Sequence, residues 1–409
     1  MGRGSTSTAS RLALCGALLL AAAPARSEVG NGQEHRRVRR RGFRLEADLA
    51  WGVTTSCDLR ETLRYTPVTG LQPGLLCTWR RPIREGRGDL VLDTAFAPDT
   101  GAGGDLLLGP RLRLASGPLA EIGAQYHALT DSNDTWRTPR LQSALSFALQ
   151  NRPDAEFFRR EGFTAFVTTR PLERLLLGVE YRLDEYSSLA SREGVSTLPE
   201  DDEIVFQNHA IEAGRIGSLV LRGEWSSGPV ASSELDSVFR HTDLPLASEP
   251  TRTGILWLRS LNTLEIARPE LGGDERFAFT RLVSDNALVA NQGALRGLRL
   301  RLRLGADWGE APPQKQETLG GWSALRGPAF NRYRGNLSIL GVAEYRYHRV
   351  AAFVDAGAVR ERVGWSGLVW GVGGRVYLWC GLNLGAAWNP TGAGGGAFPS
   401  VRVLLSEGW

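Results

Sequence analysis

The feature that most constrains the fold of this chain is a two-residue alternation of apolar and polar side chains. Between Leu298 and Leu304, four leucines alternate with three arginines. Successive side chains of a β-strand point to opposite faces, so this segment would have one apolar and one basic face. Helical spacing is hard to find, and an all-β fold is therefore expected. The same alternation recurs in three other segments: Phe43 to Val53, Asp89 to Ala97 and Ala120 to Ala128.

Two all-β architectures fit this alternation. In a soluble sandwich the leucines would face a core and the arginines the solvent. In a membrane barrel the leucines would face lipid and the arginines a polar lumen, which is the signature of outer-membrane barrels. The alternating segments recur along the whole chain between breaks rich in Gly, Pro, Asp and Asn, such as 99–104, 131–134 and 391–396. We predict a transmembrane antiparallel β-barrel, because a closed barrel satisfies every backbone polar group internally.

The N-terminal segment predicts export across the inner membrane. Arg3 and Arg11 precede an apolar run that ends in Ala23-Pro24-Ala25, and the run is too short to span a bilayer as a helix. We interpret residues 1–25 as a signal peptide and residues 26–42 as a basic periplasmic tail. The tail either contacts anionic head groups or remains solvated. Residues 43–409 would form one outer-membrane barrel of about sixteen strands, with Trp409 as its C-terminal signal.

Cysteine usage and the lack of catalytic motifs limit the function classes. Cys57 and Cys77 either pair in an oxidising compartment or remain small hydrophobic residues. The acidic run from Glu200 to Glu203 either binds a cation or is a solvated loop. Histidines are scattered, and no hydrolase, zinc-protease or nucleotide-binding motif occurs. We therefore predict neither an enzyme nor a metal or other cofactor, and no nucleic-acid partner.

A set of short motifs lies between residues 319 and 357. These are Leu319-Gly320-Gly321, Leu325-Arg326-Gly327, Arg332-Tyr333-Arg334-Gly335-Asn336, Glu344-Tyr345-Arg346 and Phe353-Val354-Asp355-Ala356-Gly357. In this order they resemble the signature of the BamA/TamA-like outer-membrane assembly factors, also called bacterial surface antigens. The resemblance covers the last third of the chain, and the earlier part agrees in strand pattern only.

The resemblance implies a sixteen-stranded barrel whose sixth extracellular loop folds back into the lumen. Leu325, Arg326 and Gly327 would form the loop tip. The inner-wall partners would be Glu344, Arg346, Asp355 and Gly357, and Arg326 would pair with the two carboxylates. One departure is Pro328, which stands where the family has an aromatic residue. A second is the short segment before Phe43, which leaves no room for POTRA domains and resembles a barrel-only form.

Two classes of function follow from these observations. The first is insertion or translocation of proteins, or handling of lipid, at the bacterial outer membrane. Its partners would be outer-membrane lipids including lipopolysaccharide, and unfolded β-barrel clients or a secreted cargo. The second is a passive narrow pore or a structural surface protein. The signature segment favours the first class, and the lack of room for POTRA domains favours the second.

Overall fold

The structure is a computed structural model of the whole chain, and it describes most of the residues after position 43. The described ranges are 44–49, 53–58, 64–83, 87–98, 104–114, 119–136, 140–150, 155–192, 208–227, 256–291, 296–322, 324–361, 364–378, 382–390 and 400–405. The predicted signal peptide, the basic tail, the acidic run from Glu200 to Glu203 and Trp409 lie outside these ranges.

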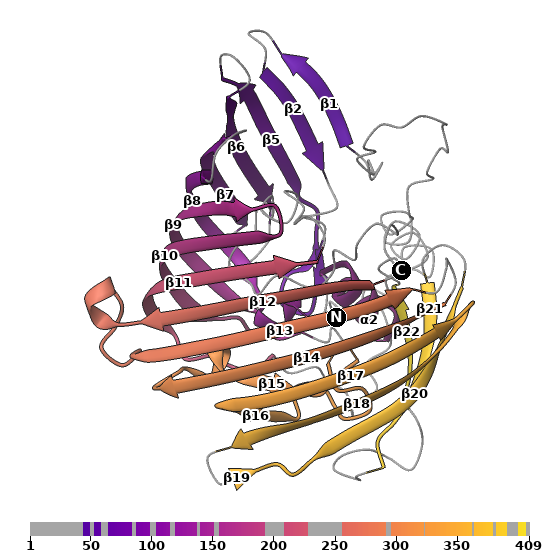
Figure 1. Cartoon of the computed structure of the whole chain (residues 1–409). Helices are drawn as coiled ribbons and strands as arrows, with labels where there is room; N and C mark the ends of the chain where they lie inside the picture. The colour runs from indigo at the N-terminus through magenta and orange to yellow at the C-terminus, as the bar shows by residue number, and fades with distance from the viewer. Residues whose placement is uncertain are drawn as a thin grey trace, which may run out of the picture.

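One antiparallel sheet of 18 strands dominates the fold (Figure 1). Its first nine strands are β1(Arg44–Leu49), β2(Val53–Asp58), β5(Leu75–Pro82), β6(Gly88–Ala97), β7(Asp105–Leu114), β8(Leu119–Asp131), β9(Phe158–Leu172), β10(Leu175–Ser188) and β11(Gly214–Ser226). The others are β12(Leu256–Ala267), β13(Phe279–Asn291), β14(Arg296–Gly309), β17(Leu337–Tyr347), β18(Val350–Glu361), β19(Gly364–Trp365), β20(Val369–Tyr377), β21(Leu382–Trp388) and β22(Ser400–Leu405). Neighbouring strands of this sheet are also consecutive along the chain and antiparallel, as expected for an up-and-down barrel.

The prediction of an all-β barrel of about sixteen strands is confirmed. Strands β19 and β20 both pair with β18 and share one place in the ladder. Strand β1 is an additional strand that folds back on β2. Setting β1 and β19 aside leaves the sixteen strands that were predicted. The expected single strand from Phe43 to Val53 is wrong, because β1 ends at Leu49 and β2 begins at Val53.

The distribution of side chains is inverted relative to a soluble protein. In β14, Leu302 is 43% exposed whereas its neighbour Arg303 is 2% exposed. The same alternation of exposed apolar and buried charged residues runs through the other long strands. An apolar outer face and a charged inner face are what a bilayer outside and a polar lumen inside require. The alternating leucines and arginines from Leu298 to Leu304 therefore belong to a barrel wall and not to a sandwich.

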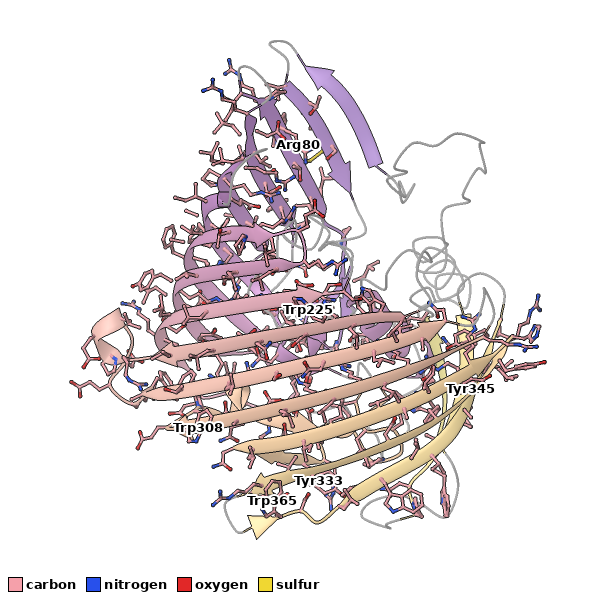
Figure 2. All side chains as sticks on the ribbon, viewed as in Figure 1. Arg80, Trp225, Trp308, Tyr333, Tyr345 and Trp365 are labelled. Carbon is pink, nitrogen blue, oxygen red and sulfur yellow. A yellow bond between two sulfur atoms is a disulfide. The ribbon has the colours of Figure 1, made fainter. Side chains whose placement is uncertain are left out.

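Exposed aromatic residues mark the two ends of the outer face. Trp308 and Trp365 lie where the strands meet the longer loops, and Tyr345 lies near the opposite end (Figure 2). Trp225 and Tyr347 also lie close to the end of the barrel where β17 turns into β18. Two aromatic girdles that flank an apolar band are typical of outer-membrane barrels. We refer below to the loop end and the turn end of the barrel.

A disulfide joins the first strands of the sheet. Cys57 of β2 and Cys77 of β5 are directly opposite in the antiparallel register and form an S–S bond. Of the two alternatives for these cysteines, the structure has the paired one. A disulfide is expected only in an oxidising compartment such as the periplasm or the cell surface. It connects residues 20 positions apart next to the N-terminal edge of the sheet.

One helix departs from the sequence expectation of an all-β chain. Helix α2(Arg140–Gln150) lies in the connection between β8 and β9, and its residues from Ser143 to Ala148 are buried. It contacts the small hairpin of β3(Arg64–Thr66) and β4(Gly70–Gln72), where the Tyr65 and Phe147 rings lie 4.9 Å apart. No helix in the described ranges has the length and hydropathy needed to cross a membrane.

Candidate functional site

Residues 310–336, between β14 and β17, fold against the inner face of the sheet. This lumen loop contains the 3-10 helix η5(Pro313–Lys315) and the short strands β15(Glu317–Leu319) and β16(Tyr333–Gly335), which pair with each other. Its long side chains are largely buried although many of them are charged. The inward-folded loop implied by the sequence resemblance is therefore present.

Arg326 at the tip of the lumen loop binds two carboxylates of the barrel wall. Its Nε and Nη2 donate to the two oxygens of Asp355, both at 2.6 Å, and its Nη1 donates to Glu344 at 2.7 Å. The backbone N–H of Arg326 also donates to Asp355 at 3.0 Å. Asp355 is 0% exposed and Arg326 is 3% exposed. The bidentate fork and the full set of hydrogen bonds satisfy charges that are removed from bulk water.

Aromatic and apolar packing holds the tip in the same place. The guanidinium carbon of Arg326 lies 3.4 Å from the ring centroid of Phe353, and Trp322 meets that ring edge-on. Leu325 is fully buried in a cluster that combines loop residues with wall residues. The members of this cluster are Leu319, Ala324, Leu325, Tyr333, Leu340, Val359 and Val369. Burial of this apolar surface stabilises the inward position of the loop independently of its ion pairs.

Three glycines allow the lumen loop to lie close against the wall. Gly327 has a φ of +113°, a conformation that side chains disfavour, and its position faces Asn389. Gly371 of β20 lies directly beneath Arg326, and a Cβ there would overlap the backbone oxygen of Arg326. Gly357 of β18 likewise leaves room for Leu319, whose Cδ1 would lie 2.9 Å from an added Cβ.

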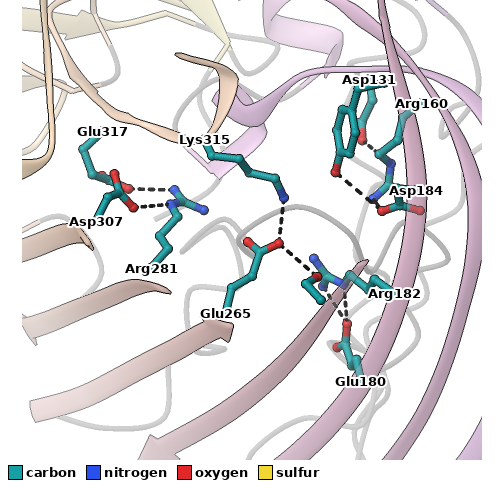
Figure 3. A network of polar contacts seen from close by, with 12 residues as sticks. Asp131, Arg160, Glu180, Arg182, Asp184, Glu265, Arg281, Asp307, Lys315 and Glu317 are labelled. Carbon is teal, nitrogen blue, oxygen red and sulfur yellow. Dashed lines mark hydrogen bonds and ion pairs between the residues drawn. The ribbon is translucent and has the colours of Figure 1, made fainter. Parts of the chain in front are cut away.

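Lys315 anchors the first part of the lumen loop to β12, which lies two strands away from β14 in the sheet (Figure 3). Its Nζ donates to Glu265 of β12 at 2.9 Å, and both side chains are 5% exposed. Arg182 of β10 lies beside this pair and binds Glu180 of the same strand at 2.6 Å. A lysine taken out of water needs such a partner. The only lysine of the sequence therefore holds the loop against the wall through an ion pair.

Glu317 makes a second anchor on β13 and β14. It accepts a 2.6 Å hydrogen bond from Arg281, and Arg303 lies 3.6 Å away. Arg303 in turn shares Asp285 with Arg301, which donates to that carboxylate at 2.9 Å and 2.5 Å. These contacts pair two of the three arginines of the alternating segment with a carboxylate of the neighbouring strand.

The charged network continues along the inner wall beyond the loop. Arg160 of β9 lies 3.2 Å from Asp131 and 3.2 Å from Asp184 (Figure 3). The other oxygen of Asp184 contacts His127 at 2.9 Å. On β11 and β12, Arg259 lies 2.7 Å from Glu224. The described part of the lumen is thus lined by alternating positive and negative groups from adjacent strands. Within the described ranges, no group of three or more His, Cys, Asp or Glu side chains is placed to hold a metal ion.

The structure brings together some of the site residues expected from sequence and separates others. Arg326, Glu344 and Asp355 converge as predicted. Arg346 does not join them, because its Nε donates to the backbone oxygen of His348 and its guanidinium lies 4.2 Å from the Tyr377 ring. Gly357 has a spacing role against the loop. Trp409 lies outside the described residues, so its role remains a prediction.

Several residues of the site were missed by the sequence analysis. Lys315, Glu317, Glu265 and Arg281 lie outside the signature segment or at positions without a motif. For Glu265 and Arg281 the available signal was their position next to apolar residues in alternating segments, where a charge on the inner face needs a partner of the opposite sign. Lys315 and Glu317 lie in the loop and had no such signal. That signal identifies a lumen residue, but it does not identify which of several opposite charges becomes its partner.

An ion pair at the loop end predicts a pH dependence of loop order. The Arg334 guanidinium donates to Glu156 at 2.6 Å, and His209 contacts the other oxygen at 3.0 Å. Burial alone would raise the pKa of Glu156, but Arg334 and a hydrogen bond from Asn331 outweigh it and lower that pKa below its ordinary value. Because the pKa of Glu156 is lowered in the folded protein, its ionised form stabilises the folded state at a pH above the ordinary glutamate pKa of about 4.3. This stability is lost as the pH falls through the folded-state pKa.

We expect this dependence to disappear in the Glu156→Gln variant. At neutral pH the backbone amides of β16 should exchange hydrogen more slowly in the wild type than in the variant, after correction for intrinsic exchange. The difference should shrink as the pH falls below about 4. Equal protection of β16 in the two proteins at neutral pH would show that this ion pair does not order the loop.

Two solved structures are similar to this one across most of the chain. The first is BamA from Haemophilus ducreyi lacking POTRA domains 1–3, with 12% sequence identity, a TM-score of 0.49, and coverage of 86% of this chain and 68% of that one. The second is CdiB from Acinetobacter baumannii, with 12% identity, a TM-score of 0.38, and coverage of 87% of this chain and 56% of that one. No protein-family model and no curated protein sequence matches the chain.

Proposed function

We propose that this chain is an outer-membrane barrel that aids the insertion or translocation of proteins, or of lipid, at the outer membrane. The observation that carries the proposal is the clamped lumen loop. A loop held by Arg326, Lys315 and Glu317 occupies the interior, so a wide open porin is a poor fit. The signature motifs that resemble the assembly factors contain Arg326 of this clamp and its two wall partners, Glu344 and Asp355.

The edges of the sheet support the same proposal. Strand β1 pairs with β2, and β22 pairs with β21. Among the described residues, no hydrogen-bond ladder joins β1 to β22. Edge strands present backbone N–H and C=O groups that can pair with an incoming strand. An incoming client strand would therefore find a template at this seam.

Outer-membrane location is supported by physical features of the chain itself. An exposed apolar band lies between two aromatic girdles, a charged lumen lies inside, and a disulfide joins β2 and β5. The N-terminal sequence has the features of a secretory leader. The partners that this location supplies are outer-membrane lipids, including lipopolysaccharide, and unfolded barrel clients or a secreted cargo. We further propose that the barrel acts without enzymatic chemistry.

The test is the outer-membrane proteome of the native host after depletion of this protein. We expect a broad loss of other β-barrels and an accumulation of their unfolded forms in the periplasm. Complementation with the wild-type chain should restore them. An unchanged set of barrels would contradict the assembly role. Steady conductance of the purified protein in planar bilayers would then favour the passive narrow pore.

A further inference from the structure

A shallow hollow lies on the lipid-facing surface of the first strands of the sheet. It has a volume of about 500 Å³ and spans β5, β6, β7 and β8, beside the N-terminal edge of the sheet (Figure 1). Its outward-facing lining includes Trp79, Leu90, Leu92, Pro110, Leu112 and Ile122. Ligand sites usually have volumes of about 300–1,000 Å³, so the hollow is large enough for part of a lipid molecule.

Pro110 accounts for the hollow. Strand β7 pairs with β8 as far as Leu108 and again from Arg111 onward, so the ladder is interrupted at Gly109 and Pro110. Proline has no backbone N–H for such a ladder. Its compact ring also lies between the longer side chains of Leu108 and Leu112 on the outer face of β7. The wall therefore has a local depression at this position.

Trp79 bounds the hollow on its loop-end side. It lies opposite Leu92 in the register of β5 and β6. Its indole N–H donates to the hydroxyl of Thr94 at 3.4 Å, and Thr94 lies two residues farther toward the loop end than Leu92. The ring therefore leans away from Leu90, and the hollow extends from Trp79 toward the turn end of the barrel.

Arg81 lines the turn end of the hollow, and its side chain is on the outer face. It lies opposite Leu90, which is 53% exposed, and it is the penultimate residue of β5. Arg81 is exposed and makes no hydrogen bond, ion pair or ring contact within the described part of the chain. The neighbouring Arg80 has the opposite orientation and lies 3.8 Å from Asp89. Arg81 is therefore a cation without a partner among the described residues, beside an apolar surface.

The position of Arg81 near the end of its strand corresponds to the membrane interface. An arginine on the lipid-facing side of a barrel is destabilising at the bilayer midplane and nearly neutral at the interface. Long basic side chains there extend their charged end to the head groups. In the outer membrane the short turns of a barrel face the periplasm, which assigns Arg81 to the periplasmic leaflet. The lipids of that leaflet are phospholipids, whereas lipopolysaccharide occupies the other leaflet.

We propose that the hollow and Arg81 bind one anionic phospholipid of the periplasmic leaflet. The phosphate accepts hydrogen bonds from the planar guanidinium of Arg81. One acyl chain lies in the depression at Pro110, against Leu90 and Leu92. An acyl chain extends from its head group toward the bilayer midplane, and the hollow extends from Arg81 in the same direction. The cation and the apolar surface thus follow each other in the order of the parts of a phospholipid.

The charge of the site favours an anionic head group over a zwitterionic one. None of the described residues that line the hollow carries a carboxylate. Arg111 also borders the hollow, but its guanidinium faces the lumen and lies 2.7 Å from Asp93. The ammonium of a zwitterionic head group therefore has no counter-charge beside Arg81. A head group with net negative charge retains its full attraction to the guanidinium.

The site goes beyond the proposed function and does not depend on it. The hollow adjoins the strands that the disulfide between Cys57 and Cys77 joins. A ligand that binds only the folded barrel stabilises it by mass action. Phosphatidylglycerol should therefore raise the temperature of the heat-induced gel shift in the wild type more than in Arg81→Gln.

Native mass spectrometry of the purified full-length barrel in detergent micelles tests the proposal. The probes are phosphatidylglycerol and phosphatidylethanolamine with identical acyl chains, each titrated separately. We expect the wild type to retain one phosphatidylglycerol more tightly than its first phosphatidylethanolamine. Arg81→Gln should weaken phosphatidylglycerol binding about fivefold, the effect of one basic side chain near an anionic lipid, and should abolish the preference. Leu92→Trp should weaken the binding of both lipids, because the indole fills the space of the acyl chain.

Two control variants make the same chemical changes outside the hollow. Arg349→Gln removes an exposed arginine in the turn between β17 and β18, at the same end of the barrel. Leu302→Trp enlarges an exposed leucine of β14. Both variants should bind each lipid like the wild type. Every variant must keep the heat-modifiable gel mobility of a folded barrel.

Three results would overturn the site. The first is equal binding of phosphatidylglycerol by Arg81→Gln and the wild type. The second is an equal loss of binding in Arg349→Gln, which would indicate a general effect of surface charge. The third is equal retention of the two lipids by the wild type. Displacement of phosphatidylglycerol by lipid A would overturn the assignment to the periplasmic leaflet.

Photo-crosslinking in the native host tests for a protein occupant of the same hollow. With p-benzoylphenylalanine at position 92, we expect no cross-linked product of higher mass on a denaturing gel. A product with the mass of two copies of this chain, or of this chain and another protein, would overturn the lipid assignment. If lipid binding holds but depletion leaves the outer-membrane proteome unchanged, the assembly role is contradicted and the site stands.

Discussion

The Arg326→Ala variant should insert as a barrel but lose the compactness of the wild type. The substitution removes the three hydrogen bonds that the guanidinium donates to Asp355 and Glu344. The fourth hydrogen bond, from the backbone N–H of residue 326 to Asp355, is lost only if the loop moves. It leaves the fully buried Asp355 carboxylate without its main counter-charge. Removal of one partner from a buried ion pair costs about 3–5 kcal/mol. We expect faster trypsin cleavage between residues 310 and 336 and a lower temperature for the heat-induced gel shift.

The Arg326→Lys variant separates charge from geometry in this experiment. Lysine keeps the positive charge but lacks the planar fork that reaches both oxygens of Asp355 and Glu344 together. We expect its trypsin cleavage rate and its midpoint temperature for the heat-induced gel shift to lie between those of the wild type and Arg326→Ala. If Arg326→Ala matched the wild type in both cleavage rate and midpoint, the clamp would not hold the loop, and the packing of Leu325 and its neighbours would account for the loop position.

The inner and outer faces of the barrel wall could be predicted because they depend only on alternation within each strand. Alternation sets the face of every residue in a strand once the register of one residue is known. This is why the segment from Leu298 to Leu304 correctly predicted an outer face of leucines, three of them exposed, and an inner face of arginines, of which Arg303 is buried and the other two are half-buried. The convergence of Arg326, Glu344 and Asp355 came from a different source, the resemblance of the motifs between residues 319 and 357.

The partners of the other lumen charges could not be predicted for a physical reason. Lys315 and Glu265 are 50 residues apart, and their meeting depends on how far the loop reaches across the lumen. Alternation places Glu265 on the inner face, but it does not state which loop residue arrives there. Helix α2 was missed for a related reason, since its residues are stabilised by burial against the β3–β4 hairpin rather than by a clear periodicity of their own. The split of the first strand was missed because the alternation in the sequence continues without a break from β1 into β2.

The dense pairing of charges also suggests why the loop has a defined position. Buried ion pairs contribute little net stability relative to apolar packing, but mispaired charges are strongly disfavoured. A loop shifted by two residues would still bury apolar surface. It would leave Asp355, Glu265 or Glu317 without a counter-charge in the lumen. We therefore interpret Arg326, Lys315 and Arg281 as residues that favour the observed loop position over a shifted one.

The Gly371→Ala variant should displace the loop tip without removing any charged group. Gly371 lies beneath the tip, and an added Cβ would overlap the backbone oxygen of Arg326. The backbone at this position is ordinary strand, so alanine itself is tolerated and the clash with the loop is the whole effect. The tip must rise, and Arg326 then loses its short contacts to Asp355 and Glu344. We expect trypsin sensitivity of residues 310–336 close to that of Arg326→Ala.

The matched control for this experiment is Gly341→Ala on β17. The nearest heavy atom to an added Cβ at Gly341 is the backbone oxygen of Ala356 at 3.8 Å, an ordinary contact. This variant should be cleaved at the wild-type rate. Because Gly371 and Arg326 act on the same tip, their double variant should be little worse than either single one, as expected for coupled residues. Wild-type behaviour of Gly371→Ala, or full additivity in the double variant, would show that the tip does not rest on β20.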